Sequence, residues 1–162
     1  MTEPVVLLNV DTRGVATITL NRPKVNNAYN GEVIEAMIDA VGECASNEDI
    51  RVLVIKGKGK HFQAGADLKW LKEIGSLSPD ENINVSRLTA TAIRGLTEIS
   101  KPTVALIHGG CFGGGTGIAA ACDIVLASND AIFSITETRW GVMASVIIPQ
   151  LNASIGVRNT RR

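Results

Sequence analysis

A glycine-rich segment, residues 107–118, is the first part of the chain whose composition suggests chemistry. Six glycines fall within nine positions, between an apolar run and a helix-forming run. Glycine is used where the backbone approaches another group closely or takes a positive φ. The first N–H groups of a helix have no partner within the helix and lie at the positive end of its dipole. We therefore expect amide hydrogens here to bind a phosphate or an oxyanion formed during a reaction.

Glu137 is the acidic residue whose neighbours best suit proton transfer. It lies in a segment that also contains Phe133, Ile135 and Trp140. A carboxyl group among large apolar side chains is desolvated, which raises its pKa toward the range where it exchanges protons near neutrality. The alternative is a surface glutamate paired with Arg139, and composition alone favours that interpretation.

A dinucleotide-binding motif is a second interpretation of the glycines. Residues 115–120 match GxGxxA, and Asp130 or Glu137 would be the acid expected about 20 residues further on. The match leaves four of the six glycines without a role, and it leaves a second small-residue turn, residues 64–67, unused. Short glycine patterns also occur often by chance. We therefore rank this interpretation below the oxyanion one.

The other polar motifs carry weaker signals. Lysines alternate with glycines over residues 56–60, which is typical of a solvated turn and, alternatively, of a surface that binds a phosphate-bearing ligand. His61 and His108 lack the spacing of metal ligands, so we expect structural roles for both and no metal site. The chain contains neither a GKS/GKT phosphate loop nor a GxSxG nucleophile motif.

Strands and helices alternate along the chain and would position these residues. Residues 52–74 and 103–122 each read as an apolar strand, a small-residue turn and a helix, which favours an α/β fold of stacked repeating units. We also expect a hairpin from residues 5–10 and 15–20, and a helix over 31–45 with Asn30 as its N-cap. Further expectations are a polar loop over 75–84, a helix over 85–99, and short strands at 124–126 and 132–134.

Composition limits the class of protein. The 162 residues suit one domain spanning 1–162, and 45% hydrophobic residues with 4% aromatics predict an aliphatic core. Sixteen basic residues balance sixteen acidic ones, which gives no field to attract nucleic acid or a membrane surface. Three cysteines without CxxC spacing are expected to be free thiols. With no secretion signal at the N-terminus, we expect a cytoplasmic protein.

Several motifs in series resemble the crotonase (enoyl-CoA hydratase/isomerase) superfamily. They are residues 21–24 (NRPK) with Asn27-Ala28, residues 62–68 (FQAGADL), residues 113–115 (GGG) and residues 121–124 (ACDI). Their order and spacing match over essentially the whole chain. The resemblance implies a spiral of repeated ββα units in which the two small-residue turns face one another.

The resemblance also implies a substrate and a set of site residues. The substrate would be an acyl-CoA thioester, so CoA is part of the substrate and no further cofactor is expected. The N–H groups of Ala66 and Gly114 would form an oxyanion hole, and Glu137 would be the catalytic acid/base. CoA would be bound by Lys24, Val25, Ala64, Gly65, Asp67 and Leu68. Asp67 has an alternative role as the N-cap of the following helix.

The sequence departs from the family pattern at three places. Gly117 stands where two-carboxylate hydratases carry a first catalytic glutamate. Residues 141–149 differ from the usual proline- and glycine-rich loop beside the acyl group, which suggests an unusual acyl chain, branched or of the glutaconyl type. The chain also ends before the C-terminal helical part with which family members build trimers, so we expect a homotrimer or a dimer of trimers only for a full-length protein.

These observations predict an enoyl-CoA hydratase-like enzyme that adds water to a 2-enoyl-CoA. The absence of the first glutamate leaves two alternatives open. One is an enoyl-CoA isomerase with Glu137 as its sole acid/base, and the other is an acyl-CoA binder without catalytic activity.

Overall fold

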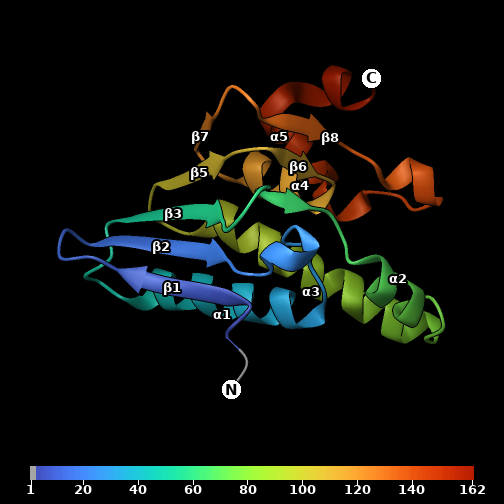
Figure 1. Ribbon diagram of the computed structural model, residues 1–162, viewed down its shortest axis with the longest axis horizontal. Coiled ribbons are helices and arrows are strands. Elements are labelled where there is room, and N and C mark those ends of the chain that lie inside the picture. Colours follow the sequence, from blue (N-terminus) through green and yellow to red (C-terminus); the bar gives the residue numbers. More distant parts are fainter. Residues whose placement is uncertain (1–2) are drawn as a thin grey trace.

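The computed structural model describes residues 3–162, except for the side chains of Thr138 and Trp140. A five-stranded sheet in the order β1-β2-β3-β5-β7 forms one layer (Figure 1). Its strands are β1 (Val6–Val10), β2 (Val15–Leu20), β3 (Val52–Gly57), β5 (Thr103–Ile107) and β7 (Ile124–Ala127). The first two strands pair antiparallel, as the expected hairpin requires, and the other neighbours pair parallel.

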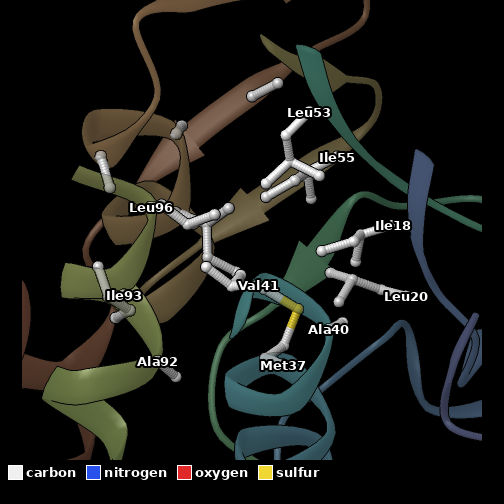
Figure 2. Packing of buried hydrophobic residues seen from close by; sticks show 14 of the residues in the cluster. Ile18, Leu20, Met37, Ala40, Val41, Leu53, Ile55, Ala92, Ile93 and Leu96 are labelled. Carbon is white, nitrogen blue, oxygen red and sulfur yellow. The ribbon is translucent and has the colours of Figure 1, made fainter. Parts of the chain in front are cut away.

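Two long helices, α1 (Gly31–Ser46) and α3 (Pro79–Glu98), pack against each other along this sheet. Figure 2 shows Met37 and Val41 from α1, Leu96 from α3, and Leu53 and Ile55 from β3 as parts of one buried cluster. These side chains are almost fully buried and nearly all aliphatic. The core is therefore of the aliphatic kind that the low aromatic content predicts.

A second sheet of three short strands lies beside the first. It contains β4 (Gln63–Ala64), β6 (Gly110–Phe112) and β8 (Ile132–Ser134), all parallel, in that order. The remaining elements are η1 (Pro23–Val25), α2 (Leu68–Ile74), α4 (Gly114–Ala121), η2 (Glu137–Trp140), η3 (Ser145–Ile147) and α5 (Ile148–Thr160). Both expected strand–turn–helix units are present, one running from β3 through β4 to α2 and the other from β5 through β6 to α4.

The expected polar loop over residues 75–84 is wrong, because α3 begins at Pro79 and covers its second half. Ser78 caps this helix: its hydroxyl accepts from the Glu81 N–H, and the Glu81 carboxylate accepts from the Ser78 N–H. A Ser-x-x-Glu capping box with proline at the first helical position is a strong start signal. The polar residues that suggested a loop are the exposed first turns of a helix.

The glycine-rich segment also differs from expectation. Gly110–Phe112 is a strand, and α4 begins at Gly114, four residues earlier than the helix-forming run indicates. The sequence does not indicate this strand, because it is short, begins with glycine and does not form a long apolar run. Its residues pair in register with β4 and β8. Within residues 3–162, no helix combines the length and the hydropathy needed to cross a membrane.

Candidate active site

The three predicted chemical groups follow the carboxyl ends of three neighbouring parallel strands. Ala64 on β4 pairs with Phe112 on β6, which pairs with Ser134 on β8. Ala66 and Gly114 each come two residues after these positions, and Glu137 comes three residues after. Because parallel strands end at the same edge of a sheet, this register places all three groups together.

Ala66 lies opposite Tyr29 in a parallel bridge. The Tyr29 N–H donates to the Gly65 carbonyl at 2.9 Å, and the Asp67 N–H donates to the Tyr29 carbonyl at 2.8 Å. In such a bridge one residue uses both of its backbone groups, and the residue opposite uses neither. Among the described residues, the Ala66 N–H accordingly has no acceptor. The bend before it is held by the Gly65 N–H, which donates to the buried Gln63 side chain at 2.8 Å.

Gly114 is the first residue of α4, a position whose N–H has no partner within its own helix. Gly113 precedes it with φ +52, which a residue with a side chain adopts only at a cost, and its N–H donates to the Ser134 carbonyl at 2.9 Å. The Gly114 N–H has no acceptor among the residues that the structure describes. The parallel register of β4 and β6 brings the two amides to the same edge of the small sheet, where both residues line one cavity.

Glu137 begins η2, and its carboxylate lies against Gly113, where a Cβ would overlap Oε1. Its Oε2 is buried and has no hydrogen-bond partner among the described atoms. Burial raises the pKa of Glu137, and the nearby N–H groups of Glu137 and Thr136 only partly oppose this. The expected rise in the pKa of Glu137 is therefore found, but Phe133 and Ile135, the neighbours expected to cause it, are exposed, and the carboxyl group lies against Gly113 instead. No pair with Arg139 is present among the described residues.

A cavity of about 200 Å³ brings these groups together. Its wall includes Ala66, Gly114 and Glu137, together with three of the residues expected to bind CoA, namely Ala64, Gly65 and Leu68. The rest of the wall is mainly apolar and comes from Tyr29, Thr136, Leu71 on α2, residues 142–144 and η3. The arrangement can hold a polarised oxygen at the two amides beside a carboxyl group that exchanges protons.

The remaining predicted CoA residues lie outside this cavity. Lys24 and Val25 are exposed on η1 and line a separate hollow of about 340 Å³ with Arg22 and Lys58. Asp67 lines neither space, but its carboxylate pairs with Arg22 at 3.1 Å and so connects the two regions. The predicted residues thus fall into two sets, one lining the cavity with Glu137 and the other, Lys24 and Val25, lining the separate hollow.

Asp67 is the N-cap of α2, because its Oδ1 accepts from the Lys69 N–H at 3.0 Å. Burial raises the pKa of Asp67, but the hydrogen bonds from Arg22 and from backbone N–H groups outweigh burial and hold the pKa below its usual range. Arg22 also donates to the Ala28 carbonyl. This arginine therefore ties together η1, the approach to α1, and the bend that carries Ala66.

We expect Arg22→Gln to lower the free energy of unfolding by about 2 kcal/mol at pH 7, because it removes a partly buried charged hydrogen bond. The depressed pKa of Asp67 gives stability that is present above its unfolded value of 3.8 and is lost as pH falls through the folded value. The difference between the two proteins in urea denaturation should therefore shrink at pH 3. Arg22→Lys is the control that keeps the charge, and an equal difference at both pH values would contradict the assigned pair.

The position of the absent first glutamate is filled by packing. A Cβ on Gly117 would overlap Ile147 Cγ2, would lie 2.9 Å from Ile147 Cβ, and would lie 3.3 Å from Ile93 Cδ1. Ile147 is 1% exposed. Gly117 is therefore required for the contact of α4 with η3, and the described cavity wall offers Glu137 as its one carboxyl group.

The same contacts argue against the dinucleotide interpretation of residues 115–120. A Cβ on Gly115 would lie 2.9 Å from Gln63 Oε1, so this glycine and Gly117 serve close packing of α4 inside the fold. His61 accepts from the Gly110 N–H at 2.8 Å, and His108 contacts the Gly59 carbonyl at 2.8 Å. The structural roles expected for both histidines are confirmed. No cluster of three metal-ligating side chains occurs in the described part of the chain.

Sequence reasoning missed three residues that shape the site: Arg22, Tyr29 and Gln63. Gln63 is buried, and its sequence context is that of an ordinary strand residue. Tyr29 lies in the loop between η1 and α1, where no motif indicates a role in the site. The chain has a single tyrosine and only two tryptophans, and one of these, Trp70, packs edge-on against Tyr29 at 5.7 Å. The scarcity of aromatic residues was the one signal that pointed to this pair.

Comparison with known proteins agrees with the geometry. The sequence model of the enoyl-CoA hydratase/isomerase family matches residues 11–162. The short-chain-enoyl-CoA hydratase of Clostridium acetobutylicum is 35% identical over 129 residues, and the mitochondrial Delta(3,5)-Delta(2,4)-dienoyl-CoA isomerase of Dictyostelium discoideum is 33% identical over 144 residues. A crystal structure of an enoyl-CoA hydratase from Shewanella pealeana superposes with a TM-score of 0.94 at 31% identity.

These matches cover most of this chain but a smaller share of the related proteins. The alignments span 79% of this chain and 48% of the C. acetobutylicum protein, and 84% of this chain and 49% of the D. discoideum protein. The S. pealeana superposition covers 98% of this chain and 59% of that chain. The chain thus spans about half the length of the curated relatives that it matches.

Proposed function

Because the chain belongs to the enoyl-CoA hydratase/isomerase family and has the crotonase fold, we propose that its site binds an acyl-CoA thioester and stabilises its enolate. The thioester oxygen accepts from the N–H groups of Ala66 and Gly114. Two fixed N–H donors that face the developing negative charge lower the activation barrier for enolate formation. Loss of one such donor typically raises that barrier by about 3 kcal/mol. The observation that carries this proposal is the pair of amides without acceptors beside the desolvated Glu137.

Glu137 is the acid/base of the proposed reaction. Starting from a 3-enoyl-CoA, its carboxylate removes a proton from C2, and the electron pair passes into the thioester to give a dienolate. The protonated carboxyl group then returns the proton to C4, and the product is the 2-enoyl-CoA. One carboxyl group completes this sequence, which matches the one that the described cavity wall provides.

Hydration of a 2-enoyl-CoA is the second candidate, because relatives with this activity in their names match the chain. Water would add to C3 and a proton to C2, so Glu137 would have to orient the water and supply the proton. Ile147 occupies the place of a second acid, and apolar side chains form most of the wall. These contacts support migration of the double bond as the first candidate, and hydration, which the sequence predicts first, stays a prediction.

The basic hollow at Lys24, Val25 and Lys58 supports the proposed binding of the CoA nucleotide. Glu3 also lines this hollow and pairs with Lys58 at 3.5 Å, while Arg22 pairs with Asp67. Lys24 makes no ion pair among the described residues, so its charge is the one best placed to bind a phosphate group. Asp67 orients Arg22 between the two regions.

We expect CoA thioesters to bind the protein in a calorimetric titration and NAD to show no binding. The reason is that Gly115 and Gly117 are packed against Gln63 and Ile147, so no phosphate has access to them. Measurable affinity for NAD, with none for a CoA thioester, would overturn the proposal.

A panel of 2-enoyl- and 3-enoyl-CoA esters, run in deuterium oxide, tests which reaction occurs. Bond migration gives a conjugated 2-enoyl product in which Glu137 has carried the C2 proton to C4, with deuterium at C4 only as far as the carboxyl group exchanges with the solvent. Hydration gives a 3-hydroxyacyl-CoA with deuterium at C2. Detection of the hydroxyacyl product alone would establish the hydratase and reject the isomerase.

A further inference from the structure

Tyr29 contacts both of the backbone segments that carry the proposed oxyanion donors. Its own N–H and carbonyl bind the residues on either side of Ala66, so the bend at residues 65–67 is fixed to the Tyr29 backbone. Any residue other than proline at this position makes these bonds. The backbone contact is therefore not specific to tyrosine.

The contact with the second segment depends on the aromatic ring. A Cβ added to Gly114 would lie 2.6 Å from Tyr29 Cε1 and 3.1 Å from Cδ1, so the ring edge lies directly on the Gly114 backbone. Trp70 on α2 supports the ring from another side, with centroids 5.7 Å apart and planes at 67°. The ring is thus held between α2 and the first turn of α4.

Tyr29 and Gly114 also line a second, apolar cavity of about 30 Å³ between α1, α3 and α4. The ring therefore forms part of the wall between the proposed catalytic cavity and the interior of the protein. Without it, the start of α4 would face an enlarged void and would have no aromatic surface against which to rest. Burial and the nearby carboxylate of Glu137 raise the pKa of Tyr29 to about 12, so its hydroxyl stays neutral.

We propose that the ring of Tyr29 is a positioning element of the oxyanion hole: it sets the place of the Gly114 N–H relative to the Ala66 N–H. This inference rests on the proposed function. Tyr29 joins the two donors: its backbone is bonded on either side of Ala66, and its ring contacts Gly114. The ring, and not the hydroxyl group, performs this role, because the atoms nearest a Cβ on Gly114 are the ring carbons Cε1, Cδ1 and Cζ.

Tyr29→Phe and Tyr29→Leu separate the ring from the hydroxyl. We expect Tyr29→Phe to turn over enoyl-CoA esters close to the wild-type rate, because the ring contact with Gly114 is kept. Tyr29→Leu fills part of the space without a ring, and we expect kcat to fall roughly 10- to 100-fold with little change in KM, as for a donor misplaced by about 1 Å.

A spectroscopic measurement reports how the two N–H donors polarise a bound thioester, without requiring turnover. In a Glu137→Gln background, bound 2,4-hexadienoyl-CoA should absorb at longer wavelength than in water, because the two amides polarise its thioester carbonyl. The red shift should persist when Tyr29→Phe is added and should shrink or vanish with Tyr29→Leu. Thermal unfolding of each variant shows whether the fold is retained.

Two outcomes would overturn the inference: an unchanged red shift in the Tyr29→Leu protein, or an equal loss of kcat in the Phe and Leu variants, which would assign the role to the hydroxyl group. Failure of the proposed function is distinguishable, since the wild type would then turn over no ester in the panel while the red shift still reports on the donors. Absence of any hexadienoyl-CoA binding by the Glu137→Gln protein would overturn both.

Discussion

Replacing Glu137 with glutamine is expected to lower kcat/KM for enoyl-CoA esters by about 10²- to 10⁴-fold, the range that a positioned acid/base contributes. The amide occupies nearly the same volume beside Gly113, so binding of the thioester should be kept. Steady-state kinetics on the Glu137→Gln protein, with binding measured by calorimetry, provides the test. A large loss in kcat with little change in affinity is the expected combination.

The same substitution is expected to stabilise the fold. The pKa of Glu137 is raised above 4.5, so its contribution to stability is complete below the unfolded pKa and is lost as pH rises through the folded pKa. At pH 7 the buried charge therefore opposes folding, and its unpaired Oε2 adds to the cost. We expect Glu137→Gln to raise Tm at pH 7, with a smaller difference at pH 4. Activity of the wild type should in turn rise with pH through the folded pKa.

Glu98→Gln is a matched control for this experiment. Glu98 is exposed at the end of α3 and pairs with Arg94 one turn away. The Glu98→Gln substitution should leave both kcat and Tm near the wild-type values. If Glu137→Gln left turnover unchanged, the assigned acid/base would be wrong, and if the wild type itself showed no turnover, the protein would be an acyl-CoA binder.

Gly117→Glu is the second substitution with a large expected effect. It would restore the missing carboxyl group in sequence, but its Cβ would overlap Ile147 and crowd Ile93, and the charge would enter a buried region. Overpacking costs about 1–3 kcal/mol, and burying an unpaired charge adds to this. We expect a loss of at least about 3 kcal/mol in urea denaturation and no gain in hydration.

Gly42→Glu provides the control. A Cβ on Gly42 meets no atom within 4 Å, and the residue is exposed on α1. This change should be neutral or slightly stabilising, because glutamate forms helix better than glycine. A Gly117→Glu protein as stable as the Gly42→Glu protein would show that Ile147 yields easily and that the site can accept a second acid.

The double substitution Gly117→Glu with Ile147→Ala makes space for the new side chain. We expect it to recover part of the lost stability and to increase the ratio of hydration to bond migration on 2-enoyl-CoA esters. A ratio equal to that of the wild type in a folded double variant would contradict the idea that Ile147 decides the reaction.

Much of this site can be predicted from local sequence. The two small-residue turns lie where local sequence predicts them, and Asn30 and Asp67 cap helices as their side chains predict. The choice of Ala66 and Gly114 within those turns comes from the family resemblance. What the sequence does not indicate depends on pairing between distant segments. The register of β4, β6 and β8 sets the proximity of the donors, yet these strands have only two or three residues each and show no periodicity of their own.

Contacts between side chains and glycine positions were equally hidden. Nothing near Tyr29 in sequence shows that its ring lies on Gly114, and nothing near Gly117 shows that Ile147 fills the place of an acid. The first turns of α3 were mistaken for a loop because their residues are polar, although Ser78 and Glu81 supply a capping box. Local signals thus located the groups, and only tertiary packing shows how they are held.

The most direct test of the account is a crystal structure of the Glu137→Gln protein with a bound enoyl-CoA. We expect the thioester oxygen to lie about 2.7–3.1 Å from both the Ala66 nitrogen and the Gly114 nitrogen. A bound ester whose carbonyl oxygen lies beyond hydrogen-bond distance of both amides, with its acyl group away from residue 137, would contradict it.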